Sequence, residues 1–182
     1  MTELIFPPMQ KIARYSRICT ITEKIDGTNA SIFISEDLSE FRTGSKTRWI
    51  TPQQDNNGFS RWAHEHKDDL MQLGPGQHFG EWWGLGIQRT YGQTCKRFSL
   101  FNTRRWKDVR LSCCDLVPVI YEGMFKQSAI EAALQDLQLQ GSFAAPGFMQ
   151  PEGVVIYHHA AKQFFKKTLI GDEKPKGSKE EA

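Results

Sequence analysis

A lysine placed two residues before an Asp-Gly pair, between two β-prone segments, raises the question of a covalent nucleophile. Lys24 lies in the stretch ITEKIDGTNASIFI. A hairpin turn favours Asp-Gly but has no need of a lysine before it, and a single strand lysine is most often solvated. Further charged residues stand beside or near glycines along the chain, at Arg42, Glu81, Glu152 and Lys166. Glycine at such points lets a bulky ligand approach the backbone closely.

Six short motifs that contain these residues resemble, in the same order, those of the covalent nucleotidyltransferases, which are the ATP-dependent polynucleotide ligases and mRNA capping enzymes. Lys24-Ile25-Asp26-Gly27 matches the nucleotidyl-lysine motif K-x-D-G, and the wider E-K-I-D-G-T-N is similar to its RNA-ligase form. The other five are Arg42-Thr-Gly, GEWWGLGIQ at 80–88, FSLFN at 98–102, Glu152-Gly-Val-Val and FKKT at 165–168. The resemblance therefore extends from Glu23 to Thr168.

The resemblance implies an ATP-dependent RNA ligase that joins 5′-phosphate and 3′-hydroxyl RNA ends. In that family a lysine attacks the α-phosphorus of ATP and releases pyrophosphate. AMP then passes to the 5′-phosphate of a strand, and a 3′-hydroxyl finally displaces AMP. The implied cofactors are ATP and Mg²⁺, with Mn²⁺ as a substitute.

The resemblance also assigns catalytic roles. Lys24 is the expected nucleophile, and Lys166 and Lys167 are expected to grip the α-phosphate, although which of the two makes this contact stays open because Thr168 replaces the second lysine of the common K-x-K pattern. A free lysine has a pKa of ~10.4, so the reaction needs neighbouring cations and desolvation to yield a neutral amine. Glu152 is a hard oxygen ligand suited to Mg²⁺.

Nucleotide-binding roles follow in the same way. Glu81 is expected to hold the ribose hydroxyls, Asn29 to bond nucleotide groups, and Phe101 to stack on adenine. The backbone near Glu23 is expected to read the adenine edge and so select ATP over GTP. Arg42 is expected to meet phosphates of ATP or of the strand.

Three other functions share some of these features. A DNA ligase or a GTP-using capping enzyme would use the same chemistry, and a non-catalytic nucleic-acid-binding relative would keep only the fold. Many ligases carry a C-terminal OB domain, whereas here only a charged tail is expected after the fifth motif. We therefore expect a nucleotidyltransferase domain over residues 1–170, a tail at 171–182, and a separate strand-binding partner protein as an open alternative.

The elements that must position these residues mix strands and helices without regular alternation, which indicates an α+β fold with mainly antiparallel sheets and flanking helices. Strands are expected at 19–22 and 30–34 around the Asp26-Gly27 turn region, then at 41–50, 77–83, 98–101, 116–120, 153–157 and 163–169. One helix is expected at 59–73. Another is expected at 128–139, opened by a capping box from Ser128 to Glu131 and ended by Gly141.

Composition limits the class of protein. The 182 residues are 39% hydrophobic with a net charge of +2, which suits one globular domain and does not by itself indicate nucleic-acid binding. The four cysteines form no C-x-x-C pair, which favours a reducing compartment. With no signal-peptide pattern and no long apolar run, we expect a cytoplasmic protein with no membrane association and, by analogy, an RNA-repair role. For Arg89, contact with a strand end and a structural loop role are equally favoured.

Overall fold

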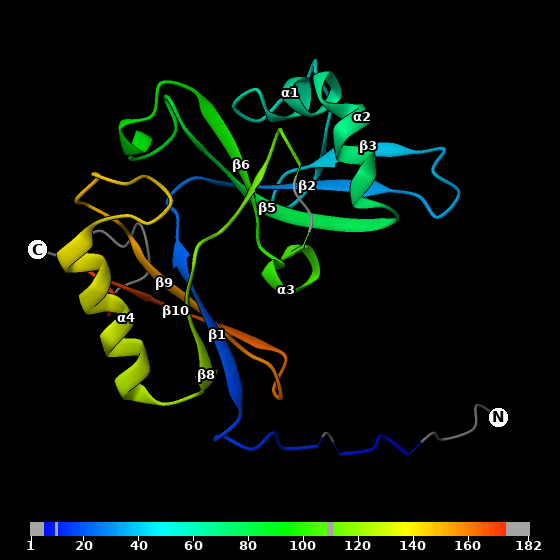
Figure 1. Cartoon of the computed structure of the whole chain (residues 1–182). Helices are drawn as coiled ribbons and strands as arrows, with labels where there is room; N and C mark the ends of the chain where they lie inside the picture. Colours follow the sequence, from blue (N-terminus) through cyan, green and yellow to red (C-terminus); the bar gives the residue numbers. More distant parts are fainter. Residues whose placement is uncertain (1–5, 10, 109–110, 174–182) are drawn as a thin grey trace, which may run out of the picture.

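Two β-sheets make up most of the molecule (Figure 1). The computed structural model describes residues 6–9, 11–108 and 111–173. The first sheet has the strand order β10 (Gln163–Thr168), β9 (Gly153–His158), β1 (Ile18–Lys24) and β8 (Val119–Met124). The second has the order β4 (Trp49–Ile50), β3 (Phe41–Gly44), β2 (Thr28–Ile34), β5 (Gly76–Gly84), β6 (Lys96–Leu100) and β7 (Asp115–Leu116). Neighbouring strands are antiparallel except for β6 and β7, as the α+β expectation required.

Helix α4 (Gln127–Gln140) covers one face of the first sheet (Figure 1). Its buried residues Ala129, Ile130, Ala133 and Leu137 recur at helical spacing. They pack with Cys19 and Ile21 of β1, which point to the same face because successive strand residues alternate. The other face of β1 therefore carries the side chains of Thr20, Thr22 and Lys24.

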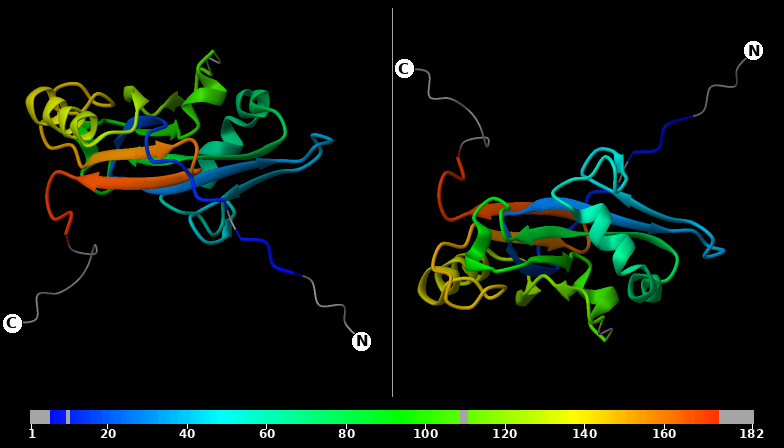
Figure 2. Two further views of the ribbon diagram at one scale, coloured as in Figure 1. Left: turned by 90° about the horizontal axis from the view of Figure 1, so that it is seen from below. Right: turned by 90° about the horizontal axis from the view of Figure 1, so that it is seen from above.

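The second sheet is covered by short helices around Phe59, which is fully buried. These are α1 (Phe59–Glu65), α2 (Lys67–Leu70) and the 3₁₀ turn η1 (Met71–Leu73). A further 3₁₀ turn, η2 (Thr90–Gly92), follows β5, and α3 (Thr103–Trp106) follows β6. Figure 2 shows the molecule from two opposite directions, below and above the view of Figure 1, with α4 at one end and the β2–β3 hairpin at the other.

Four sequence predictions of local structure were wrong. The helix expected at 59–73 is broken at His66, where φ is −108° and ψ is 21°. The segment 41–50 is a hairpin rather than one strand, since the Ser45 N–H donates to the Arg48 carbonyl at 2.8 Å. The segment 116–120 divides at Pro118, which lacks an N–H, into strands of different sheets. Helix α4 begins at Gln127 after the N-cap residue Lys126, so Ser128 does not open it.

The Asp26-Gly27 region does not connect a hairpin, because β1 and β2 belong to different sheets. Other boundaries agree with expectation, including Gly141 at the end of α4 with φ of 80°. No helix in the described part of the chain is long and apolar enough to cross a membrane. Most of the expected tail, 174–182, lies outside the described residues.

The packing of α4 predicts a clear contrast between two of its leucines. Leu137 is fully buried, whereas Leu139 is 70% exposed. We expect Leu137→Ala to lower the free energy of unfolding by ~2–5 kcal/mol, because it leaves a cavity against β1 and β9. Leu139→Ala serves as the control and should change it by less than about 0.5 kcal/mol. Urea unfolding of both variants measures this, and equal losses would contradict the packing described.

Candidate active site

A cavity of about 1020 Å³ lies between residues of the two sheets. The first sheet contributes side chains from β1, β9 and β10, and the second contributes β2, β5 and the segment that follows β6. Its lining includes the expected site residues Lys24, Asn29, Glu81, Phe101 and Lys166, as well as Glu23. Residues far apart in the sequence are therefore gathered around one space large enough for a nucleotide.

Lys24 ends β1 and forms an ion pair with Glu152, whose Oε2 accepts a hydrogen bond from Nζ at 2.7 Å. The register explains the contact, because Lys24 pairs directly with Gly153 of β9. Glu152 is 7% exposed and Lys24 is 23% exposed on the side-chain scale. The expected nucleophile and the expected metal-binding carboxylate are thus in direct contact. A reaction at the Lys24 amine would require this contact to break.

Gly153 lets the strands meet closely at this point. Its φ of 153° lies in the region that favours glycine, and a Cβ there would press on the backbone of Lys167 and Thr168 in β10. Gly27 has the same importance on the other side of Lys24, since a Cβ would lie 2.5 Å from the Trp82 carbonyl oxygen. Both glycines of the motifs are therefore required by close packing around Lys24.

The loop after Lys24 is fixed by contacts with the segment after β5. Arg89 Nε donates to Asp26 Oδ2 at 3.0 Å, and its NH1 group donates to the carbonyl oxygens of Gln150 and Pro151. The Asp26 backbone N–H donates to the Tyr91 hydroxyl at 2.8 Å. Arg89 therefore joins the loop after Lys24 to the residues just before Glu152. This supports the structural alternative for Arg89, while the sequence carried no signal for Tyr91.

Glu81 lies opposite Asn29 in the β2–β5 register and bonds the same loop. Its Oε1 accepts from the Gly27 N–H at 3.1 Å, and its Oε2 accepts from the Asn29 amide at 3.2 Å. Burial raises the pKa of Glu81 to about 7, against the opposing effects of the Lys24 charge and these two hydrogen bonds. A carboxyl group that gains or loses a proton near neutrality thus lines the cavity.

Of the two remaining expected nucleotide contacts, Glu23 belongs to the cavity lining and Arg42 does not. The Glu23 carboxylate faces away from the cavity and accepts from the Ser142 hydroxyl at 2.6 Å and the Ala144 N–H at 2.9 Å. Burial raises its pKa despite these bonds. The Glu23 N–H already donates to the Pro118 carbonyl. Arg42 is exposed in β3, pairs with Glu40 at 2.8 Å, and does not line the cavity.

The two adjacent lysines of β10 lie on opposite sides of the strand. Lys166 pairs with Val155 in β9 and lines the cavity. Lys167 instead donates to Asp172 at 3.3 Å and is absent from the lining. The alternation of strand side chains makes both positions inside the cavity impossible without a bulge. The geometry therefore assigns the cavity position to Lys166.

The acidic groups fit a metal ion only if a ligand brings further oxygens. Among the described residues no group of three or more His, Cys, Asp or Glu residues could hold a metal ion. Mg²⁺ commonly binds one or two carboxylates together with substrate phosphates and water. Glu152 lies beside the cavity and suits that role, whereas the described residues do not form a metal site made of protein ligands alone. Phe101 offers a partly exposed ring to the same space, and Asn102 caps α3 by accepting from the Arg105 N–H.

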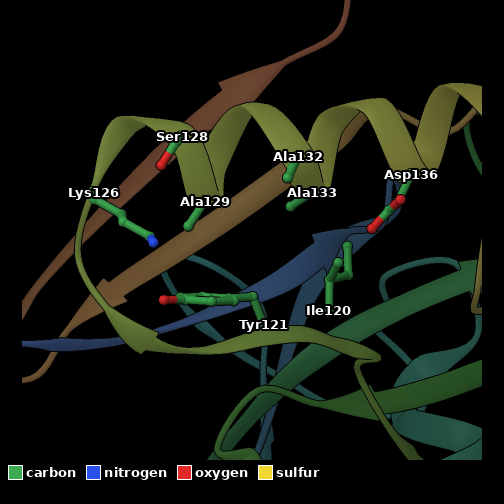
Figure 3. Close-up of a pocket in the computed structure, with 8 residues that line it drawn as sticks. All are labelled: Ile120, Tyr121, Lys126, Ser128, Ala129, Ala132, Ala133 and Asp136. Atoms are coloured by element: carbon green, nitrogen blue, oxygen red, sulfur yellow. The ribbon is translucent and has the colours of Figure 1, made fainter.

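A second hollow of about 240 Å³ lies between α4 and β8 (Figure 3). Alanines of α4 face Ile120 and Tyr121 across it, with Lys126 and Asp136 toward its two ends. It lies on the face of the first sheet opposite Lys24 and gathers no chemistry-bearing cluster. The candidate active site is therefore the larger cavity.

Comparisons with known proteins point to one family. A family model described as RNA ligase matches residues 17–168. No curated protein matches the chain.

Solved structures of a Naegleria gruberi RNA ligase share the fold. An arginine-to-alanine variant with ATP and Mn aligns with a TM-score of 0.60 and 15% identity over 85% of this chain and 50% of that chain. A lysine-to-methionine variant with AMP and Mn gives the same values. The chain thus spans about half the length of these structures. At this identity the likeness concerns the fold.

The raised pKa of Glu81 predicts a pH-dependent stability. Between pH 4.5 and about pH 7, the Glu81 carboxyl group is deprotonated in the unfolded chain but protonated in the folded chain. The free energy of unfolding therefore falls as pH rises through this range. The gap corresponds to about 3 kcal/mol. Glu81→Gln should remove this component, which urea unfolding across that pH range measures. Glu65→Gln changes an exposed carboxylate and should keep the wild-type slope; equal slopes in both variants would contradict the assignment.

Proposed function

The chain belongs to the RNA ligase family, and from this premise we propose that it is an ATP-dependent RNA ligase that works through a covalent Lys24–AMP intermediate. The observation that carries the proposal is the ion pair of Lys24 and Glu152 at 2.7 Å beside a cavity lined by Glu81, Phe101 and Lys166. The family match favours RNA over the alternatives of a DNA ligase or a capping enzyme.

In the first step the Lys24 amine attacks the α-phosphorus, a new N–P bond forms, and pyrophosphate leaves with the electrons of the broken P–O bond. Lys24 first gives up its proton and its contact with Glu152. Lys166 pairs with Val155 of β9, two residues beyond Gly153, which is the partner of Lys24. Its ammonium group can neutralise charge on the α-phosphate, which is the main need of nucleotidyl transfer. A divalent cation would supply further charge neutralisation, with Glu152 among its ligands.

The remainder of the cavity suits an adenosine. Phe101 provides a ring for stacking, while Glu81 and Asn29 form a polar wall near Lys24 that suits ribose hydroxyls. The RNA 5′-phosphate would then attack the phosphorus of Lys24–AMP, breaking the N–P bond and returning the electron pair to Lys24. A 3′-hydroxyl would finally displace AMP from the activated strand. The solved relatives contain ATP or AMP together with Mn, which supports the use of ATP and a divalent metal here.

The nucleophile is tested by covalent labelling with α-labelled ATP and Mg²⁺. We expect label on the wild-type protein and none on Lys24→Ala, because the amine that forms the N–P bond is gone. Lys24→Arg, which keeps a positive charge near Glu152, should also stay unlabelled. Label on either variant would overturn the assignment. Labelling with GTP in place of ATP, and sealing of 5′-phosphorylated RNA against DNA, distinguish the capping and DNA-ligase alternatives.

The neighbouring lysines of β10 form a matched pair for a second test. Lys166→Met should slow formation of the labelled protein by about 10²-fold or more, which is the usual effect of removing a group that stabilises transition-state charge. Lys167→Met should label at close to the wild-type rate, since its ammonium group contacts Asp172 away from the cavity. Single-turnover labelling measures both rates. The reverse order of effects would show that Lys167 enters the site.

A further inference from the structure

The cavity continues beyond the space that one adenosine phosphate needs near Lys24. Along β1 the side chains that face it are Lys24, Thr22 and Thr20, so its far end lies ~13 Å from Lys24 at about 3.3 Å per residue. On the first sheet this end is lined by Tyr157 and Phe164, which pair with each other across β9 and β10. None of the family motifs includes these positions, and the chemistry proposed for Lys24 does not use them.

Two aromatic rings at this end form an open stacking surface. The centroids of Tyr157 and Phe164 are 4.5 Å apart with an interplanar angle of 35°. Phe164 is 61% exposed although it belongs to a regular strand at the edge of the sheet. An exposed ring supported from beneath by another ring has no role in the core. It suits a flat ligand, because every nucleobase offers a π face.

An imidazole and a guanidinium group lie beside these rings. Arg104 of α3 donates from NH1 to His159 Nδ1 at 3.3 Å, and His159 Nε2 bonds Thr20 Oγ1 at 2.9 Å. This contact links the two sheets across the far end of the cavity. Among the described residues, no carboxylate lies within ion-pair distance of Arg104 or of the adjacent Arg105. The guanidinium of Arg104 has five N–H donors and uses one of them here.

The balance of charge favours an anionic ligand. Burial and then the Arg104 charge lower the pKa of His159, and the nearby carboxylate of Glu122 in β8 acts in the opposite direction. An anion beside Arg104 would stabilise the charge of its guanidinium group, whereas a cationic or purely apolar ligand would not. Phosphate is the anion that accompanies a stacked base in nucleic acid.

We propose that Tyr157, Phe164, Arg104 and His159 form a distal subsite that binds one nucleotide of single-stranded RNA. Its base stacks on the aromatic pair, and its phosphate accepts hydrogen bonds from the remaining N–H donors of the Arg104 guanidinium, which His159 holds in place. The subsite rests on the proposed function, since it would hold the strand that exchanges AMP with Lys24. It gives the domain its own contact with RNA, continuous with the nucleotide cavity.

The subsite is tested by binding of a short 5′-phosphorylated RNA to full-length protein, followed by fluorescence anisotropy. Phe164→Leu keeps an apolar side chain but removes the stacking face, and should weaken binding by at least about fivefold, the lower end of one base–aromatic contact. Phe143→Leu is the matched control, because that ring is also partly exposed, at 38%, but does not line the cavity. It should bind RNA as the wild type does.

The phosphate contact has a separate readout. Arg104→Gln should reduce the slope of log Kd against log salt concentration by about 0.7, the value for one phosphate contact to a single strand. Arg61→Gln removes an exposed charge from α1 and should leave the slope unchanged. Equal effects of the two arginine variants would overturn the phosphate contact and show only bulk electrostatics.

The subsite and the proposed function fail in different ways. If the wild type forms no labelled Lys24, the ligase proposal fails while the binding measurements still decide the subsite. If labelling succeeds but Phe164→Leu binds RNA normally, the subsite is wrong. If Phe164→Leu raises the ATP concentration needed for labelling and leaves RNA affinity unchanged, the aromatic pair belongs to the adenosine, which also overturns the proposal. A preference for duplex over single-stranded RNA would count against it as well.

Discussion

The pairing of Lys24 with Glu152 is the contact on which the arrangement of the site depends. Two charged side chains at the edge of a buried region are stable there only when they neutralise each other. Their meeting requires β1 and β9 to be adjacent and in one register, and it requires Gly153 to let β10 pack alongside. The positions of Lys166 and Phe164 then follow from the same sheet, because each is fixed by its partner on β9.

The opposite wall depends on the short loop between the sheets. The chain leaves β1 at Lys24 and enters β2 at Thr28, so it passes from one sheet to the other in three residues. Glu81, Arg89 and Tyr91 all bond this loop. These contacts place Glu81 and Lys24 close enough for their charges to influence each other. The relative position of the two sheets near Lys24 is therefore set by a few polar bonds in addition to apolar packing.

Much of this site could be predicted from the sequence, and the limits have physical causes. Lys24, Glu81, Glu152 and Lys166 stand in local motifs, so the sequence could predict that they gather around one site, as the structure shows. Arg42 looked similar but depends on where β3 lies, and the structure directs it to solvent beside Glu40. Strand alternation predicts that only one of Lys166 and Lys167 faces the cavity. Which of the two does so depends on how β10 pairs with β9, and the sequence does not specify this pairing. Arg104 and His159 carried no signal, because their contact joins two sheets across 55 residues of sequence.

The ion pair of Lys24 also has a consequence for the chemical survival of the protein. An ammonium ion cannot attack electrophiles, so a lysine held by Glu152 is shielded from acylating metabolites and from other reagents that modify free amines. The carboxylate that we propose as a metal ligand would then also act as a protecting group at rest. Only a ligand able to draw Glu152 away, such as a nucleotide with its cation, would expose the amine. Lys24 would thus react with its proposed substrate and not with most other electrophiles.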